Sequence, residues 1–88
     1  MVAEVKILNR MGLHARPAAL IARCAAGFEC SVSLTREGQS SADGKSILSL
    51  LMLGAPCGAV LTLEAAGSDE AEAIAAISTL FESKFDEE

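Results

Sequence analysis

The longest uncharged stretch of the sequence, residues 46–63, constrains the fold more than any other single feature. Its 18 residues without Asp, Glu, Lys or Arg approach the length of a membrane-spanning helix. It is interrupted by Gly54, Pro56 and Gly58, which are typical of a turn and would break such a helix. The first ten residues are short and mixed in charge, unlike a signal peptide. We therefore expect two short elements around a turn, in a cytoplasmic protein without a membrane segment.

A chain of 88 residues is expected to form a single domain, residues 1–88, around one small core. Its only histidine excludes sites built from several histidines, and we expect neither a metal ion nor a cofactor. The net charge of −5 argues against a nucleic-acid partner, because such proteins usually carry a basic patch. The three cysteines lack metal-ligand spacing, so we expect buried thiols in a reducing compartment at Cys24, Cys30 and Cys57.

Four segments have the pattern of β-strands. The clearest contains Cys30, Val32 and Leu34, which alternate with polar residues as in a half-buried strand. The polar sequence of residues 36–39 predicts a tight turn after it. The predicted strands are residues 2–8, 29–35, 40–42 and 59–65.

Two segments between the predicted strands favour helices. Residues 16–26 are rich in alanine, and Pro17 fixes the start because proline is tolerated only in the first turn of a helix. Gly27 is a plausible stop for this helix. Ser46 lies in N-cap position for a short apolar helix over residues 47–53.

A third helix is expected near the end of the chain. Ser68 or Asp69 would cap it, and Asp69 with Glu72 matches a capping box. One apolar stripe is predicted to run the length of this helix, through Ile74, Ile77, Phe81 and Phe85, and the charged residues 86–88 are expected to fray. The resulting order, β-α-β-β-α-β-α, predicts an α+β fold with one sheet covered by helices on one face.

Charge is distributed unevenly along the chain. Residues 1–45 hold six basic and four acidic side chains, a net charge of +2. Residues 64–88 hold one basic and eight acidic side chains, a net charge of −7. We therefore expect anion chemistry in the first half, and a solvated helix face and tail in the second.

His14 is the residue whose surroundings point most clearly to chemistry. A histidine at this place could be only a cap or a loop residue. It lies, however, directly before a helix whose unpaired amide groups and partial positive charge favour anions. Arg16 follows within the first turn and could hydrogen-bond a phosphate, while Gly12 gives the preceding backbone freedom. A neutral imidazole is a competent nucleophile, so the segment could carry a phosphoryl group.

The run Gly12-Leu13-His14-Ala15-Arg16-Pro17-Ala18 is similar to the active-site motif of HPr, the histidine-containing phosphocarrier family of the bacterial phosphotransferase system. Chain length, element order and the segment from Lys45 to Gly54 extend the resemblance over nearly the whole chain. It implies a two-layer open-faced sandwich, in which three helices cover one face of a four-stranded antiparallel sheet with strand order 1-4-2-3.

The resemblance also implies a function. His14 would accept a phosphoryl group on Nδ1 from enzyme I, which is charged by phosphoenolpyruvate, and would pass it to an enzyme IIA domain. Arg16 would stabilise the phosphoryl group, aided by Ala15 and Pro17 at the helix start. Such a protein is a carrier and not an autonomous enzyme, and we expect a monomer.

Ser46 is a second candidate site. Its position as an N-cap is sufficient to explain it. In one branch of the family, however, the serine at this place is phosphorylated by a dedicated kinase, HPr kinase/phosphorylase, which weakens contact with enzyme I. The alternative function is therefore a regulatory binding module controlled by Ser46. Residues 81–88 and 50–53 resemble the nitrogen-related branch, whereas Lys45-Ser46 resembles the sugar-transport branch.

Apolar residues around these two sites are predicted to form the docking face for the partner proteins. We expect Leu20, Ile21, Leu50 and Leu53 to lie mostly inside, and Arg10, Arg23 and Lys45 to rim the face and attract acidic partners. The candidates for the face are Leu13, Leu20, Ile47, Leu48, Leu51 and Met52.

Overall fold

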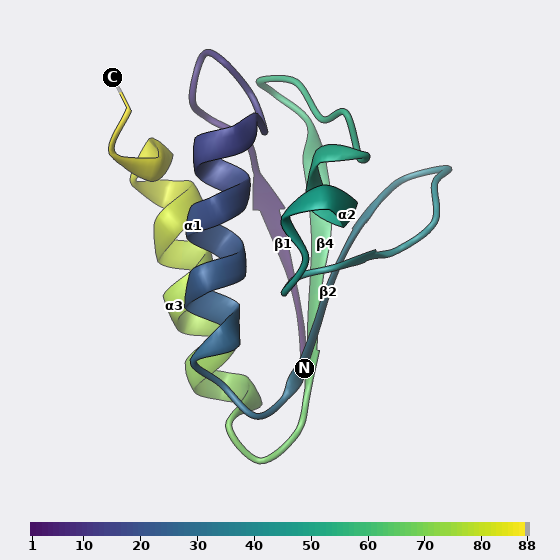
Figure 1. The fold of residues 1–88 in the computed structure, drawn as a ribbon, viewed down its shortest axis with the longest axis vertical. Coiled ribbons are helices and arrows are strands. Elements are labelled where there is room, and N and C mark those ends of the chain that lie inside the picture. Colours follow the sequence, from purple (N-terminus) through teal and green to yellow (C-terminus); the bar gives the residue numbers. More distant parts are fainter. Residues whose placement is uncertain (88) are drawn as a thin grey trace.

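The fold is built on a four-stranded antiparallel sheet in the order β1-β4-β2-β3, in a computed structural model that describes residues 1–87 (Figure 1). Its strands are β1 (Val2–Lys6), β2 (Ser31–Arg36), β3 (Ala42–Asp43) and β4 (Val60–Ala66). β4 lies inside the sheet and pairs antiparallel with both β1 and β2. The predicted antiparallel sheet and its strand order are confirmed.

The burial pattern of β4 shows which face of the sheet carries the core. Leu61, Leu63 and Ala65 are buried, and the residues between them are exposed. In the register of the sheet, Leu63 lies opposite Leu34 of β2, and Leu61 lies opposite Val5 of β1. A shift of one residue would turn these apolar side chains to solvent, so the alternation itself fixes the register.

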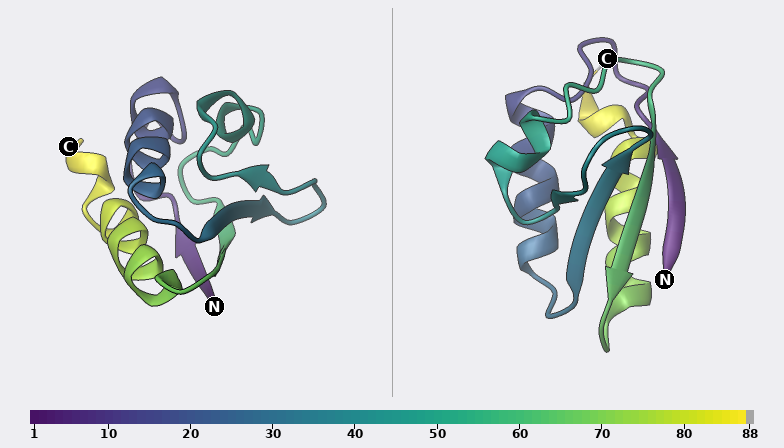
Figure 2. Two further views of the ribbon diagram at one scale, coloured as in Figure 1. Left: turned by 60° about the horizontal axis from the view of Figure 1, so that its bottom comes forward. Right: turned by 90° about the vertical axis from the view of Figure 1, so that its right-hand side faces the viewer.

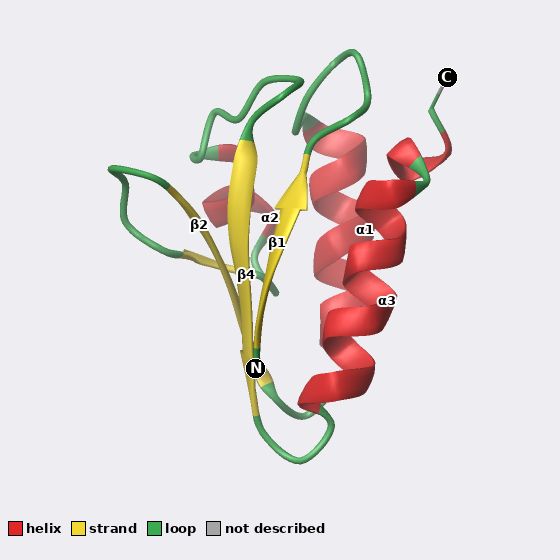
Figure 3. Ribbon diagram, turned by 180° about the vertical axis from the view of Figure 1, so that it is seen from behind, coloured by secondary structure: helices red, strands yellow, loops and turns green. Residues whose placement is uncertain are grey.

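Three helices cover the buried face, as predicted (Figure 2). They are α1 (Ala15–Ala26), α2 (Ile47–Leu51) and α3 (Glu70–Glu82). α1 and α3 run side by side, whereas α2 packs on the opposite side of α1, as Figures 1 and 3 show. The core fills the space between the layers, and its fully buried members include Ile7, Ile21, Leu34, Leu50, Leu61, Leu63, Ile77 and Phe81.

The end of the last helix differs from the prediction. α3 stops at Glu82, and Lys84, Phe85 and Asp86 form a short turn with φ values of 56°, 55° and 58°. Residues other than glycine rarely adopt this left-handed conformation. Phe85 is nevertheless fully buried and packs edge-to-face on Phe81, with ring centroids 5.0 Å apart. Its burial, which the helical stripe predicted correctly, is therefore achieved by a left-handed turn after α3 and not by a longer helix.

The start of α3 also corrects a prediction. Asp69 is the N-cap residue, but its side chain makes no cap hydrogen bond. Its carboxylate instead accepts from the backbone N–H groups of Glu29 and Cys30, at 2.8 and 2.9 Å. Asp69 thus links α3 to the entrance of β2, and the predicted capping box with Glu72 is not formed.

The three cysteines do not share one environment. Cys30 is buried, Cys24 is half-buried and Cys57 is exposed, and all three are free thiols. Cys57 is exposed because it lies in the surface loop that leads into β4. The residue type alone, a small apolar side chain, does not indicate such a position. The prediction of three buried thiols is therefore wrong for Cys57.

None of the helices in residues 1–87 has both the length and the apolar character needed to cross a lipid bilayer. The longest of the three, α3, has 13 residues, whereas a spanning helix needs about 20. The uncharged stretch 46–63 contributes α2 and most of β4, separated by the loop that contains Pro56.

Candidate functional site

His14 stands at the start of α1, at the end of a tightly held loop. The N–H of Leu13 donates to the carbonyl oxygen of Ala55 at 2.9 Å, which ties this loop to the one before β4. Gly12 has φ of +75°, and a Cβ atom there would lie 2.9 Å from that same carbonyl oxygen. Only glycine fits this position without strain, so Gly12 fixes the path by which the backbone presents His14.

The first turn of α1 leaves its donors open. His14 is the N-cap residue, and its carbonyl oxygen accepts from the N–H of Ala18, but its side chain makes no cap hydrogen bond. Within residues 1–87, the backbone N–H groups of Ala15 and Arg16 have no acceptor, and Pro17 has no N–H to offer. The helix therefore presents two unpaired amides beside the imidazole, an arrangement that favours an anion.

The imidazole of His14 is partly open to solvent and has a partner that the sequence did not suggest. Its side chain is 34% exposed, and Nε2 lies 2.8 Å from a carboxylate oxygen of Glu87. Glu87 also contacts Nη1 of Arg16 at 3.4 Å. The same Nη1 donates to the carbonyl oxygen of Phe85 at 2.6 Å. The C-terminal segment is thus joined to both predicted site residues.

Asn9 completes this cluster from the other side. Its side chain is fully buried, and Nδ2 donates to the carbonyl oxygen of Gly12 at 2.8 Å and to Glu87 at 3.0 Å. Asn9 and Glu87 were both missed by sequence reasoning. Asn9 carried no signal beyond a break in the strand pattern, and Glu87 was assigned to a frayed, solvated tail, which is wrong for this residue. Glu88 lies outside the described residues.

Hydrogen bonding controls the charge of Glu87. Its side chain is only 16% exposed, and this burial by itself would raise the pKa. The hydrogen bonds from Asn9, His14 and Arg16 outweigh burial, and together they hold the pKa of Glu87 below its ordinary value. Glu87 is therefore ionised at neutral pH, and the site contains a fixed negative charge on the Nε2 side of the imidazole.

Ser46 caps α2, as predicted. Its hydroxyl oxygen accepts from the N–H of Ser49 at 3.2 Å. Directly after it, α2 exposes Ile47 and Leu48, with exposures of 45% and 70%. Ser46 therefore satisfies the start of its own helix and borders an apolar surface.

The predicted docking residues divide between surface and core. Ile47, Leu48 and Met52 are exposed, Leu20 and Leu51 are half-buried, and we call these five residues the apolar docking surface. Leu13 does not belong to it, because the fixed loop turns its side chain into the core, where it is 6% exposed. The interior positions are confirmed for Ile21, Leu50 and Leu53, which are fully buried or nearly so, whereas Leu20 is only partly covered.

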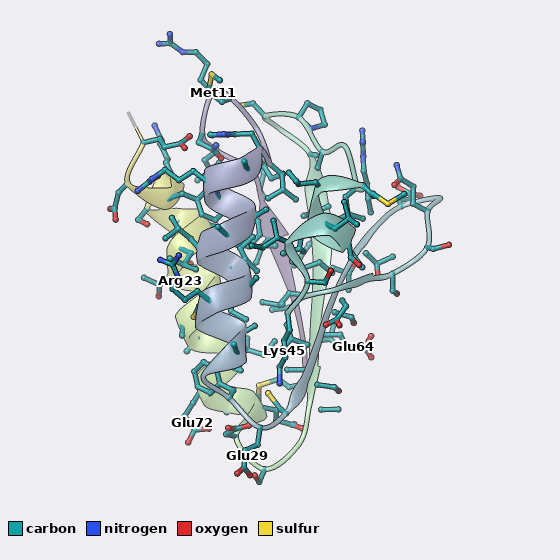
Figure 4. The ribbon with its side chains drawn as sticks, viewed as in Figure 1. Met11, Arg23, Glu29, Lys45, Glu64 and Glu72 are labelled. Atoms are coloured by element: carbon teal, nitrogen blue, oxygen red, sulfur yellow. The ribbon has the colours of Figure 1, made fainter. Side chains whose placement is uncertain are left out.

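The charged residues expected around this surface are scattered. Figure 4 shows Arg23 on the α3 side of α1, away from α2. Lys45 lies far from Met11, which marks the loop before His14, and its Nζ donates to the carbonyl oxygen of Phe28 at 2.9 Å. Arg23 therefore does not border the side of α1 that faces α2, whereas Lys45 lies two residues before Ile47 of the docking surface.

Within residues 1–87, no group of three or more His, Cys, Asp or Glu side chains is arranged to hold a metal ion. The start of α1 brings together an accessible imidazole, two free backbone amides, a guanidinium that is 50% exposed and a carboxylate that is 16% exposed.

Comparisons with known proteins agree on one family. A family model described as "PTS HPr component phosphorylation site" matches residues 1–83. The chain is 43% identical to the phosphocarrier protein HPr of Treponema pallidum, over 100% of this chain and 99% of the relative. It is 40% identical to the phosphocarrier protein NPr of Escherichia coli K12, over 96% of this chain and 93% of the relative. The crystal structure of HPr-C-His from Thermoanaerobacter tengcongensis superposes with a TM-score of 0.94 at 41% identity, covering 100% of this chain and 98% of that one.

Proposed function

The chain belongs to the HPr family of phosphocarrier proteins, and we propose that it carries a phosphoryl group on His14 within the phosphoenolpyruvate-dependent phosphotransferase system. Enzyme I would supply the group, and an enzyme IIA domain would receive it. The observation that carries the proposal is the accessible imidazole of His14 beside the unpaired amides of Ala15 and Arg16. The protein is a carrier in the cytoplasm and acts as a monomer, which sedimentation analysis tests.

In the proposed transfer, the lone pair of His14 Nδ1 forms a bond to phosphorus while the bond between phosphorus and the donor group of enzyme I breaks. The electron pair of the broken bond stays with the donor. The amides of Ala15 and Arg16 and the positive end of the α1 dipole would stabilise the phosphoryl oxygens. The Arg16 guanidinium would add charge-assisted hydrogen bonds. Pro17 contributes indirectly, by fixing the first turn with a residue that is buried and lacks an N–H.

A carrier must release its phosphoryl group as readily as it accepts it. The site suits this requirement because its imidazole and guanidinium are both open to solvent, and it provides one guanidinium and two amides, not a cage of fixed cations. Moderate stabilisation keeps onward transfer to enzyme IIA from stalling. The apolar docking surface combines Leu20 of α1 with residues of the neighbouring α2 and its C-cap, and would contact both partners in turn.

The decisive experiment is incubation with enzyme I and phosphoenolpyruvate. The wild type should take up one acid-labile phosphoryl group, and His14→Ala should take up none. Ser46→Ala should be charged normally and serves as the control. Acid-labile phosphorylation of His14→Ala would show that the acceptor lies elsewhere.

A second function, regulation through Ser46, is favoured by one observation. Ser46 is half-buried at the start of α2, next to the exposed Ile47 and Leu48. We propose that a phosphate there would place its charge at the edge of the apolar docking surface and weaken contact with enzyme I. Phosphoserine is stable to acid, whereas phosphohistidine is not. Acid treatment of protein modified in the cell therefore separates the two functions, and an acid-stable phosphate alone would favour regulation.

The physiological pathway is open to a direct test as well. Relatives named HPr and NPr match this chain at comparable identity, 43% and 40%. We propose that the receiving IIA domain distinguishes sugar transport from nitrogen regulation. The charged protein should be offered to IIA domains of both kinds, and the one discharged faster identifies the pathway.

A further inference from the structure

We propose that Glu87 is a positioning residue for the phosphoryl acceptor. Its carboxylate fixes the tautomer of His14 that leaves Nδ1 unprotonated, and it stabilises the positive charge that the imidazole gains during transfer. This inference rests on the proposed function, because it assigns Glu87 a part in the same reaction.

The contacts of Glu87 show that it is built into the site. One carboxylate oxygen lies 2.8 Å from His14 Nε2, and the other accepts from Asn9 Nδ2 at 3.0 Å. Asn9 is itself held by the carbonyl oxygen of Gly12 and is fully buried. Both oxygens of the carboxylate are therefore hydrogen-bonded, and its position relative to the imidazole is fixed.

The backbone before Glu87 supports the same conclusion. Three consecutive residues, Lys84 to Asp86, adopt left-handed dihedral angles, which are unfavourable for residues other than glycine. The burial of Phe85 and the hydrogen bond from Arg16 to its carbonyl oxygen offset this cost. This turn follows α3 at the end of the helical layer where α1 begins, and it places Glu87 beside His14 and Arg16 (Figure 1).

A carboxylate beside Nε2 determines which nitrogen can react. An ionised carboxylate only accepts hydrogen bonds, so Nε2 must carry the proton in this contact. A neutral imidazole has one N–H, and its lone pair therefore lies on Nδ1. Glu87 thus selects the nucleophilic form of His14 before the donor arrives, in the way that a carboxylate orients the histidine of a Ser-His-Asp triad.

The same carboxylate matters during the transfer. When Nδ1 bonds to phosphorus and the donor–phosphorus bond breaks, the imidazole still holds its proton on Nε2. It therefore carries a positive charge that it did not have before. Glu87 lies on the Nε2 side, where it stabilises this charge without occupying the place of the phosphoryl group. When the group leaves for enzyme IIA, the electron pair returns to Nδ1 and the imidazole becomes neutral again.

An opposite role is also conceivable for a carboxylate in an anion site. Glu87 contacts Arg16 at 3.4 Å, so it could be a blocking group that keeps the guanidinium from the phosphate. The two roles predict opposite changes in the rate at which enzyme I charges His14. Removing a blocking group accelerates charging, whereas removing a positioning group slows it.

The first test measures the tautomer in the free protein and needs no transfer. Nitrogen-15 NMR of the neutral imidazole, recorded at alkaline pH where its chemical shifts no longer change, reports which nitrogen of His14 is protonated. The wild type should show the Nε2–H form, and Glu87→Gln and Glu87→Ala should show a mixture. Asp86→Asn is the matched control, because Asp86 is an exposed neighbour in the same turn and Asn tolerates that conformation. An unchanged tautomer in both Glu87 variants would overturn the proposal.

The second test measures charging by phosphorylated enzyme I in rapid-quench experiments. Glu87→Gln should lower the maximal rate about tenfold with little change in KM, because losing a hydrogen bond to a charged group slows a step that depends on it by about that factor. Asp86→Asn should charge like the wild type. A change in KM alone, or a faster rate, would overturn the proposal in favour of docking or blocking. If the wild type is not charged at all, the proposed function fails, and the NMR result still decides the positioning of His14.

Discussion

The starts of α1 and α2 solve the same problem in opposite ways. Every helix begins with amide groups that have no partner within the helix. At α2, Ser46 supplies its own oxygen to the N–H of Ser49. At α1, His14 caps nothing with its side chain, and the amides of Ala15 and Arg16 stay open. A helix start that satisfies itself contributes stability, whereas one that is left open remains available to a ligand.

The largest expected effect is the loss of phosphoryl uptake when His14, at the start of α1, is replaced. His14→Ala should abolish uptake of the phosphoryl group, because the nucleophile is gone. Its melting temperature should stay close to that of the wild type, because the imidazole makes no cap bond. Mass spectrometry after reaction with enzyme I and phosphoenolpyruvate measures the uptake of the phosphoryl group, and circular dichroism measures the melting temperature. A large loss of stability would mean that α1 depends on His14 as α2 depends on Ser46.

The next effect concerns the guanidinium at the open start. Arg16→Ala should slow phosphoryl transfer about 10- to 100-fold, because one charge-assisted hydrogen bond contributes about 1.5–3 kcal/mol. Arg23→Ala, an exposed arginine further along α1, is the control and should transfer normally. Equal rates for both variants would remove Arg16 from the site.

At the start of α2, which Ser46 caps, a substitution should lower stability and leave phosphoryl transfer unchanged. Ser46→Ala should lower the free energy of unfolding by about 1 kcal/mol, the usual cost of losing an N-cap side chain. Urea denaturation measures this, with Ser68→Ala as a control because Ser68 is exposed and is not a cap residue. Charging by enzyme I should be unchanged. If Ser46→Ala slowed phosphoryl transfer as much as Arg16→Ala, the starts of α1 and α2 would not differ in function as proposed.

The start of α3 provides a third case, with the smallest effect. Hydrogen bonds from the N–H groups of Glu29 and Cys30, opposed in part by burial, hold the pKa of Asp69 below its ordinary value of 3.8. Because the pKa is lower in the folded state, the stabilisation is present above the unfolded value and is lost as pH falls through the folded value. Asp69→Asn should therefore unfold more easily than the wild type at pH 7.

The control for Asp69 is the same pair of proteins in acid. The difference in unfolding free energy between wild type and Asp69→Asn should shrink as pH falls, because the wild-type carboxylate becomes protonated. A difference that does not change with pH would assign the effect to packing and not to the charge.

Sequence patterns predicted correctly the features that depend on neighbouring residues, such as single strands, the first turn of a helix and a helix cap. The alternation of Val32 and Leu34 predicted β2, Pro17 located the first turn of α1, and Ser46 was correctly placed as a cap. Each of these depends on residues within one turn or one strand. The predicted bounds of β1, β4 and α2 differ from the observed ones by only one or two residues.

Long-range contacts were beyond such patterns. Glu87 meets His14 across 73 positions, and Asp69 meets Glu29 across 40. Neither spacing has a periodicity that a sequence can reveal. The turn at Phe85 was hidden for another reason, since an apolar residue four positions after Phe81 fits a continuing helix and a left-handed turn equally well. No glycine marks the left-handed residues.

The turn at residues 84–86 also sets an order of events during synthesis. A ribosome makes the histidine segment early and residue 87 only after residues 2–82, which contain all the strands and helices named above. The contact between Nε2 and its carboxylate therefore forms after every strand and helix has emerged, since domains fold as their chains become available. We therefore expect a chain that stops before residue 87 to display the imidazole of His14 without this neighbouring carboxylate.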